Sequence, residues 1–451
     1  MLTEQRAVPG AARRGARPWR AWLLSRGAFE TALIVLTLLA HGLLLAHGVF
    51  GDGLRRYDEL TALLAHGQIS NDKYSLIGPI FSTPLWLLGH VYRDSKWWVA
   101  RYNLLLFALA LLAIYLLLKD RIDRRLIRTF LLLLAVASMF PVPLTSYYGE
   151  TFTALLVGVG LLAAVFGPAL IGWVAVVLGV ANTAATLVAL GFAAVTRVVQ
   201  RRRLRYALAV VAAFAAIALE NYIRHGSLSN TRYESGFTYP ILFGLLSILF
   251  SFGKGLIFFA PGLLLPIRGW LRAGDENEHK LYQTYLLWVA FVAGMIVLYA
   301  NWYDWSGDWF WGPRFFLIAS LPASLALAVR LRRPSASLLA NLVTFGVLCL
   351  AAWVGLNGVL FDLNAVAAAC GTLSHLSPTC SYVPQTSALW YPFVALRLKP
   401  GGKKLLLYAG VCLIVFVYLA APLVAVIARQ AWTAGRAGAA AFLAEWRHPA
   451  A

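Results

Sequence analysis

Residues 27–59 read GAFETALIVLTLLAHGLLLAHGVFGDGLRRYDE, and the sequence changes abruptly from apolar to charged at Gly51. The stretch 27–50 is long enough to cross the hydrocarbon core of a bilayer, which takes about 20 residues of helix. Lipid offers no hydrogen-bond partners to an exposed strand edge, so a segment that spans it must be helical. We therefore predict a membrane helix that ends near Gly51, followed by a polar segment at the membrane surface.

The rest of the chain repeats this kind of apolar run. Of the 451 residues, 60% are hydrophobic and 13% are charged, about half the charged share of a soluble domain. This composition excludes a soluble enzyme, a disordered protein and a disulfide scaffold. We predict an all-α polytopic membrane protein with about twelve transmembrane helices and with interfacial helices in long exterior loops. The predicted spans are 27–50, 98–118, 127–143, 151–166, 168–182, 183–199, 205–220, 255–267, 281–300, 314–329, 337–359 and 405–427.

The formal net charge of +20, from 39 Lys and Arg against 19 Asp and Glu, is explained by membrane topology. Lys and Arg gather in the first 26 residues and in alternate loops, and cytoplasmic loops are the ones that carry such an excess. We expect both termini in the cytoplasm, with tails at 1–26 and 431–451 around a transmembrane domain at 27–430. The loops placed on the cytoplasmic side are 119–128, 197–205, 268–280 and 330–333.

Nucleic acid is not predicted as a partner, because no basic patch interleaves with exposed aromatic residues on a soluble domain. The first apolar run is long and no small-residue cleavage site follows it, which indicates a retained signal anchor. Cys370 and Cys380 flank a polar exterior loop, where a disulfide and two free thiols are both open. Cys349 and Cys412 lie in apolar runs and are expected to serve packing.

The loops on the opposite side, near 51–97, 221–254, 301–313 and 360–403, are long and hold most of the acidic residues. They also hold half of the 16 Trp. Aromatic faces beside acids and amides are typical walls for sugar rings, which are apolar on their C–H faces and need polar partners for their hydroxyls. The tryptophans in these loops are Trp86, Trp97, Trp98, Trp302, Trp305, Trp309, Trp311 and Trp390.

Asp52 opens the first of these loops between two glycines, which let the backbone turn and a substrate approach closely. We interpret it as a general base at the membrane surface, with a simple turn residue as the alternative. The stretch 57–66 has apolar residues on one helical face and is predicted to lie along the membrane. The stretch 76–88 is interrupted by proline and is predicted to be interfacial or re-entrant.

Two cations in the later loops could meet an anionic group. Lys254 lies in a Gly-Lys-Gly turn before a predicted helix, where backbone N–H groups and an ammonium converge. Arg314 follows a Gly-Pro turn and could hold a phosphate with two hydrogen bonds. The alternative for both is an interfacial side chain that reaches toward the headgroups. Glu150 starts a predicted helix, where its carboxylate acts either in function or as a cap.

Five motifs together resemble the GT-C superfamily of polytopic glycosyltransferases, which includes protein O-mannosyltransferases, aminoarabinose transferases and mycobacterial mannosyl- and arabinofuranosyltransferases. The resemblance covers most of residues 27–330 in order and spacing. The motifs are GDGLRRY (51–57), KYSLIGPIFSTPLW (73–86), SYYGETF (146–152), FSFGKGLIFFAPGLLLP (250–266) and WSGDWFWGPRF (305–315).

The resemblance implies transfer of a sugar, with inversion, from a polyprenyl-phosphate donor to a glycan, lipid or protein acceptor at the exterior membrane face. It assigns the base to Asp52, with Asp58 and Glu59 as alternatives. Lys254, Arg314 and Arg56 would stabilise charge on the donor phosphate. Predicted substrate contacts come from Tyr57, Tyr148, Glu150, Trp305, Asp308 and Trp311.

Several alternatives stay open at this point. A secondary transporter also has about twelve helices, but it would place ionisable residues within the spans. A ligase or polymerase that uses lipid-linked oligosaccharide is the other rival. The residues indicate no cofactor and no protein-built zinc site, although Asp52, Asp304 and Asp308 could hold a hard cation. The resemblance places the chain in a bacterial plasma membrane, with a mannose- or arabinose-type sugar.

Overall fold

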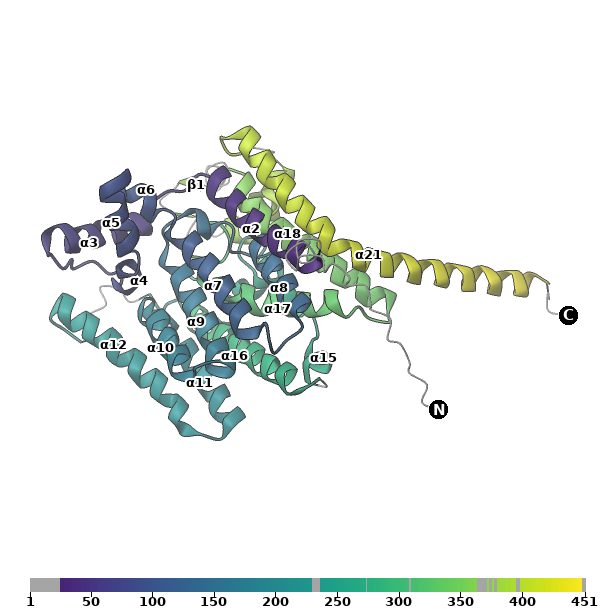
Figure 1. The fold of residues 1–451 in the computed structure, drawn as a ribbon, viewed down its shortest axis with the longest axis horizontal. Helices are drawn as coiled ribbons and strands as arrows, with labels where there is room; N and C mark the ends of the chain where they lie inside the picture. Colours follow the sequence, from purple (N-terminus) through teal and green to yellow (C-terminus); the bar gives the residue numbers. More distant parts are fainter. Residues whose placement is uncertain are drawn as a thin grey trace, which may run out of the picture.

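The computed structural model describes residues 25–228, 236–272, 274–307, 310–362, 371–372, 375–376, 379–394 and 398–447. The described chain is almost entirely helical, with helices packed side by side in one bundle (Figure 1). Its first half contains α2 (Arg26–Leu44), α3 (Asp52–His66), α4 (Ile77–Ile80), α5 (Thr83–Tyr92), α6 (Ser95–Val99), α7 (Tyr102–Leu118), α8 (Arg124–Val136), η1 (Pro143–Thr145), α9 (Gly149–Phe166), α10 (Ala169–Ala181), η2 (Ala184–Thr186), α11 (Leu187–Arg201), η3 (Leu204–Ala207) and α12 (Leu208–His225).

The second half continues the bundle and adds one short hairpin. In the hairpin, two strands of two residues pair antiparallel, with Gly371 opposite Leu376. The elements are α13 (Ile241–Phe250), α14 (Leu256–Phe259), η4 (Pro261–Leu264), α15 (Arg268–Arg272), α16 (Glu276–Tyr299), η5 (Arg314–Ala319), α17 (Ser320–Arg332), α18 (Leu338–Leu360), β1 (Gly371–Thr372), β2 (His375–Leu376), α20 (Thr379–Tyr382), η6 (Pro384–Thr386), η7 (Tyr391–Phe393) and α21 (Gly402–Arg447).

Nine helical segments among the described residues are long and apolar enough to cross a membrane. The prediction of an all-α polytopic membrane fold is therefore confirmed. The nine segments are Arg26–Leu44, Ser95–Leu118, Gly149–Phe166, Ala184–Arg201, Leu204–His225, Glu276–Tyr299, Arg314–Arg332, Leu338–Leu360 and Gly402–Ala440.

Three of the predicted spans differ from these segments in detail. The prediction of a span at 255–267 is wrong, because α14 ends at Phe259 and Pro261 starts a short 3-10 turn. Proline lacks the N–H that would continue a helix. The span predicted at 127–143 is the 13-residue α8 followed by a loop, and 168–182 is the 13-residue α10. The apolar helix α13 lies where an exterior loop was predicted.

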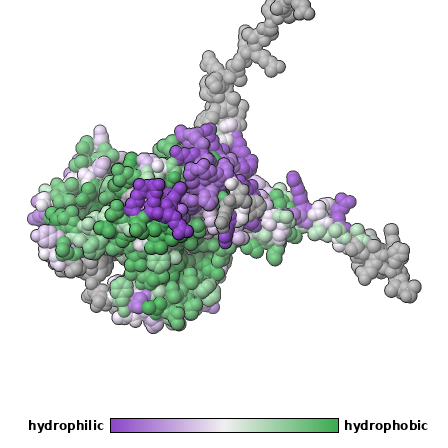
Figure 2. All heavy atoms as spheres, turned by 90° about the horizontal axis from the view of Figure 1, so that it is seen from below, coloured by the Kyte–Doolittle hydropathy of each residue, from purple (hydrophilic) through white to green (hydrophobic). Residues whose placement is uncertain are grey.

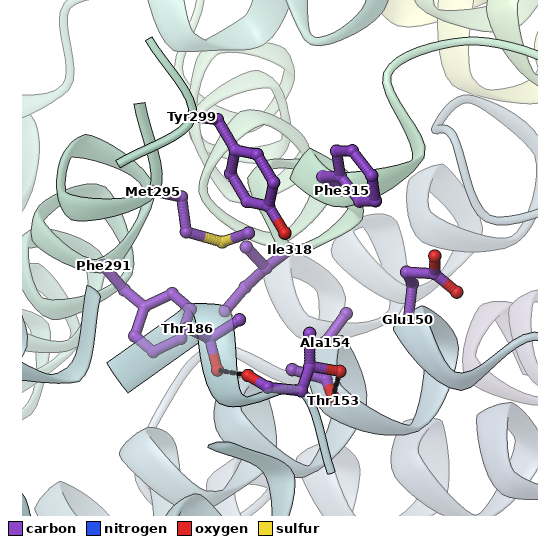
Figure 3. A pocket seen from close by; sticks show the side chains of 10 residues that line it. Glu150, Thr153, Ala154, Thr186, Phe291, Met295, Tyr299, Phe315 and Ile318 are labelled. Atoms are coloured by element: carbon purple, nitrogen blue, oxygen red, sulfur yellow. Dashed lines mark hydrogen bonds between the residues drawn. The ribbon is translucent and has the colours of Figure 1, made fainter. Parts of the chain in front are cut away.

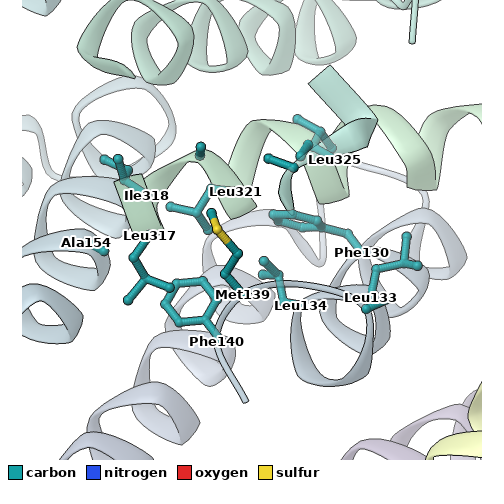
Figure 4. Packing of buried hydrophobic residues seen from close by; sticks show 14 of the residues in the cluster. Phe130, Leu133, Leu134, Met139, Phe140, Ala154, Leu317, Ile318, Leu321 and Leu325 are labelled. Atoms are coloured by element: carbon teal, nitrogen blue, oxygen red, sulfur yellow. The ribbon is translucent and has the colours of Figure 1, made fainter. Parts of the chain in front are cut away.

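The centre of the bundle is formed by α9, η5 and α17, whose residues are almost all buried. Aromatic and aliphatic side chains from α8, α17 and the segment between α8 and α9 interdigitate there, with Phe130, Phe140 and Leu321 all close to fully buried (Figure 4). Small residues bring α9 and α10 close together, since a Cβ on Gly160 would lie 2.6 Å from the backbone oxygen of Gly172. Within lipid, where the hydrophobic effect does not drive helices together, close packing of this kind holds them in contact.

One end of the bundle carries an ionic network around Glu30, which is 1% exposed. Its carboxylate accepts hydrogen bonds from Arg26 (3.2 Å), Arg128 (2.5 Å) and Tyr418 (2.5 Å). At the same end Arg332 is 2.9 Å from Asp123. The face seen from below is largely hydrophobic, and its hydrophilic residues gather in one region (Figure 2).

The helices α3 to α6 form a cap at the opposite end of the bundle, on the left in Figure 1. A separate cluster of buried side chains, including Leu60, Trp86 and Tyr147, fixes this cap on the N-terminal part of α9. Helix α12 lies at the edge of the bundle, packed on α10 and α11. Its C-terminal end reaches the cap, because Arg224 of α12 contacts Glu59 of α3.

Candidate functional site

Asp52 is the first residue of α3, and the backbone around it is crowded. Gly51 has a φ of +55°, which a residue with a side chain seldom adopts. A Cβ on Gly51 would lie 2.7 Å from the Tyr148 hydroxyl, and one on Gly53 would lie 2.6 Å from the Tyr147 carbonyl oxygen. The two glycines therefore let the start of α3 pack directly against the residues that precede α9.

Both carboxylate oxygens of Asp52 are held by neighbouring side chains. The Tyr74 hydroxyl donates to Oδ1 at 2.7 Å, and the Arg314 guanidinium donates to Oδ2 at 2.8 Å. Burial acts to raise the pKa of Asp52, but Arg314, Tyr74 and Arg56 outweigh it and hold the pKa below its usual range. The side chain is still 30% exposed. Asp52 is thus an ionised, oriented and accessible carboxylate.

Arg314 lies between two acids that come from distant parts of the chain. Its Nη1 contacts Asp52, and its Nε is 3.6 Å from Oε1 of Glu150. The guanidinium carbon lies over the rings of Phe310 and Phe315, at 5.7 Å and 5.2 Å, and over Tyr148 at 5.7 Å. These rings shield the guanidinium from water, which strengthens its attraction to the carboxylates.

Glu150 lies on the first turn of α9 and faces a small cavity (Figure 3). The cavity has a volume of about 10 Å³, room for a single water molecule. Thr153, Thr186 and the stacked pair Tyr299 and Phe315, whose ring centres are 4.5 Å apart, line the rest of it. The space beside the Glu150–Arg314 pair is therefore polar on one wall and aromatic on another.

Arg56 joins the site from the next turn of α3, on the same face as Asp52. It is 7% exposed, and its Nη1 donates to the carbonyl oxygen of Ser75 at 3.1 Å. Its guanidinium lies over the Tyr74 ring at 5.1 Å, and the missing side chain of Gly149 makes room for it. Among the residues that the structure describes, none is a hydrogen-bond partner of the Arg56 Nε.

The two alternative acids of the first loop lie elsewhere. Asp58 is exposed, on a different side of α3 from Asp52. Glu59 is 3% exposed and pairs with Arg224 at 2.6 Å. Of the three predicted candidates for the base, Asp52 is the one that the structure places beside Arg314.

Lys254 is buried and lies against the loop that precedes Arg314. Its ammonium donates to the carbonyl oxygens of Phe310 (2.5 Å) and Gly312 (3.0 Å). The helix that follows it, α14, has only four residues. Lys254 therefore contacts the backbone of residues 310–312, and it acts on the predicted site by holding this loop.

Of the aromatic residues predicted to contact the substrate, some lie near Asp52 and others are buried in the core. Trp305 is 6% exposed, and Trp311 is 2% exposed with its Nε1 donating to Asn357 at 3.1 Å. Both rings lie within the main core, so neither presents an open face to a sugar. Tyr57 packs at the edge of the cap, while Tyr148 lies on Gly51 and Arg314. Asp308 lies outside the described residues.

Tyr74 was not predicted as a site residue, although the motif that contains it, 73–86, was identified. Asn182 was not predicted as a site residue either. Its side chain accepts from the backbone N–H of Gly78 (3.0 Å) and donates to the Gly149 carbonyl oxygen (3.0 Å). Asn182 thereby ties α10, α4 and α9 together under the site, a role that no sequence spacing indicates.

No cluster of three or more His, Cys, Asp or Glu suited to a metal ion occurs among the described residues. Cys380 is disulfide-bonded, Cys349 and Cys412 are free thiols, and Cys370 lies outside the described residues.

No family model and no curated protein sequence matches this chain. Solved structures that are similar to it in fold include two crystal structures of ArnT from Cupriavidus metallidurans. The structure bound to undecaprenyl phosphate aligns over 90% of this chain and 77% of that chain, with 18% identity and a TM-score of 0.53. The apo structure aligns over 92% and 77%, with 16% identity and a TM-score of 0.52. At this identity the likeness shows a shared fold, which is the polytopic membrane fold of ArnT.

Proposed function

We propose that this chain is a membrane glycosyltransferase that moves a sugar from a polyprenyl-phosphate donor to a hydroxyl acceptor. The observation that carries the proposal is the cluster of Asp52, Arg314 and Glu150, with Tyr74 and Arg56, at the capped end of the bundle. The shared fold supports it, because one of the two ArnT structures holds undecaprenyl phosphate, a polyprenyl phosphate.

In the proposed mechanism Asp52 takes the proton from the acceptor hydroxyl, which is too weak an acid to attack unaided. The hydroxyl oxygen then attacks the anomeric carbon as the bond to the phosphate oxygen breaks. A single base carboxylate is enough for such an inverting transfer, since no covalent sugar–enzyme intermediate forms. The pKa of Asp52 is held below its usual range by Arg314, Tyr74 and Arg56, so the carboxylate is ionised at neutral pH.

The leaving group is a lipid phosphate, and negative charge grows on its bridging oxygen. Cations held in place before the reaction stabilise such charge most effectively. Arg314 lies 2.8 Å from Asp52, and the buried Arg56 has an Nε with no hydrogen-bond partner in the described part of the chain. Both are proposed to face the phosphate. Lys254 would contribute through the loop that it holds rather than as a direct ligand.

The proposed orientation puts the capped end outside the cytoplasm of a bacterial plasma membrane, and both termini inside. The basic loops then lie on the cytoplasmic side, as the distribution of Lys and Arg indicates. The donor is proposed to carry a mannose- or arabinose-type sugar, and the acceptor to be a glycan, a lipid or a protein. No nucleotide sugar needs to cross the membrane in this arrangement.

The direct test is Asp52→Asn, assayed in membranes by incorporation of label from a polyprenyl-phosphate sugar. Removal of the base should lower the transfer rate by about 100-fold or more. Asp58→Asn, on an exposed neighbour of the same helix, is the matched control and should stay near wild type. Full transfer by correctly inserted Asp52→Asn would remove Asp52 as the base. Uptake of the free substrate into vesicles, with no transfer, would indicate a transporter instead.

A further inference from the structure

Helix α12 contacts the segment 70–76, which connects α3 to α4, through two charged residues one turn apart. Glu220 accepts from the Ser75 hydroxyl at 2.8 Å and from the Leu76 backbone N–H at 2.7 Å. Arg224 donates to the carbonyl oxygen of Ser70 at 3.1 Å and to that of Tyr74. The end of α12 thus binds this segment at four of its seven residues.

The same arginine also binds α3. Its Nη2 donates to Oε1 of Glu59 at 2.6 Å, and both side chains are only 4% exposed. A buried guanidinium with several hydrogen-bond acceptors has one favourable geometry, because any other would leave its charge without partners. Arg224 therefore fixes the distance between α3 and the segment 70–76.

Helix α3 and the segment 70–76 also meet at Asp52. Helix α3 begins with Asp52, and the segment 70–76 carries Tyr74, whose hydroxyl donates to Asp52 Oδ1. The position of the Tyr74 hydroxyl depends on its backbone, which Arg224 and Glu220 hold from either side. Neither residue touches Asp52 itself.

We propose that Glu220 and Arg224 are positioning residues, which orient the Asp52 carboxylate by holding Tyr74 in place from α12. This proposal rests on the proposed function for its effect on catalysis. Tyr74 holds Oδ1 and Arg314 holds Oδ2, so the carboxylate has a defined plane in which a hydroxyl must approach. Without the contacts from α12, the Tyr74 hydroxyl would no longer hydrogen-bond to Oδ1. The carboxylate would then be held by Arg314 alone and could rotate.

The test is a double-mutant cycle of Arg224→Gln and Tyr74→Phe, with kcat and donor KM measured by sugar transfer. Each single variant should lower kcat by about 10- to 100-fold and change KM little, because misplacement of a catalytic group acts on the chemical step. The double variant should be no slower than Arg224→Gln, since Arg224 acts through Tyr74. Arg55→Gln is the matched control, because Arg55 meets Asp72 of the same segment at 3.8 Å but is 71% exposed.

Arg224→Gln leaves the buried Glu59 without its arginine partner, so folding is checked by gel filtration and thermal unfolding in detergent. If it does not fold, Glu59→Gln with Arg224→Gln removes both charges, and Glu220→Gln weakens the other half of the contact. Either should reproduce the loss of kcat. Multiplicative losses in the double variant, or kcat within twofold of wild type in folded variants, would overturn the proposal.

A readout without catalysis separates this proposal from the proposed function. Hydrogen exchange over residues 70–76 should be faster in Arg224→Gln and Glu220→Gln, and unchanged in Arg55→Gln. Unchanged exchange in all three would refute the positioning role by itself. An active Asp52→Asn variant with faster exchange in Arg224→Gln would instead refute the assignment of Asp52 as base, and with it the catalytic part of this proposal.

Discussion

At the scale of single residues, the site depends on how two carboxylates share one guanidinium. Asp52 has the closer contact with Arg314, at 2.8 Å against 3.6 Å for Glu150. Asp52 also receives the Tyr74 hydroxyl. A carboxylate that accepts hydrogen bonds in its charged form is held ionised. The arrangement therefore favours Asp52 over Glu150 for the proposed proton-accepting role, while Glu150 lines the cavity.

Replacement of Arg314 by Gln should raise the pKa of Asp52, because burial then acts with less opposition from nearby cations. The acid limb of kcat/KM against pH should move to higher pH. Affinity for a polyprenyl phosphate should also fall. A pH profile and a lipid-binding titration on the same purified variant measure the two effects. An unmoved acid limb would mean that Asp52 does not control it, and an unchanged donor Kd would reject the phosphate role.

The second residue-scale prediction concerns Glu59. Burial raises its pKa from about 4.5 to about 7, although Arg224 acts in the opposite direction. The folded chain thus holds a proton that the unfolded chain releases, so this group stabilises the fold at low pH. Its contribution is lost as pH rises from about 4.5 through about 7, at a slope on the order of 1.4 kcal/mol per pH unit. Glu59→Gln should flatten this part of a melting-temperature profile, and Asp58→Asn should not.

At the scale of elements, the loop that precedes Arg314 is held from another part of the chain. Lys254, between α13 and α14, donates to the carbonyl oxygens of Phe310 and Gly312. Gly312 has a φ of +65°, and a Cβ there would lie 2.9 Å from the Phe259 ring. The turn therefore enters η5 in one conformation, and the direction of the Arg314 side chain follows from it.

Lys254→Met should destabilise the protein, because two carbonyl oxygens of this loop lose a charged donor, at a cost of about 1–3 kcal/mol. Donor affinity should fall as a consequence of the displaced Arg314. Thermal unfolding in detergent and a lipid-binding titration give the two quantities. Loss of donor affinity with unchanged stability would instead favour Lys254 as a direct ligand of the phosphate.

Helices were predicted correctly from the sequence where a long, uninterrupted apolar run marks them. The runs 98–118 and 337–359 correspond closely to Ser95–Leu118 and Leu338–Leu360. The error at 255–267 arose because Pro261 interrupts an apolar run without changing its hydropathy. The amphipathic face of α3 was predicted to lie on lipid, but Leu60 of that face is fully buried in the cap. An apolar face alone does not tell whether lipid or protein covers it.

The candidate site was predictable as a set of residue types but not as a geometry. Asp52, Glu150 and Arg314 follow from their motifs, and each stands at the start of a helical segment. Their contacts could not be predicted, because they join residues that are far apart in sequence. Trp305 and Trp311 were expected to contact the substrate because they lie in a loop rich in aromatic and acidic residues. Both are buried instead, because a large aromatic ring can pack in a core as well as against a sugar.

At the scale of the whole molecule, charged residues gather at the two ends of the bundle. One end holds arginines around Glu30 and Asp123, and the other holds the acids of the cap and α9 with Arg314 and Arg224. A cysteine at exposed Asp58 should react with a membrane-impermeant thiol reagent in intact cells, and one at exposed Arg203 should react after the membrane is opened. The unsubstituted protein measures background from native cysteines. The reverse pattern would invert the proposed orientation.

The contact between Asp52 and Arg314 spans 262 positions of the chain. At a synthesis rate of about 5–20 residues per second, roughly 13–52 s separate the appearance of the two residues on the ribosome. During that interval the carboxylate has already emerged, while the arginine that holds it has not yet been made. A chain that stalls within this interval holds the Asp52 carboxylate through Tyr74 alone, without Arg314. Chains that end before η5 should therefore show no sugar transfer, even if their first helices are inserted.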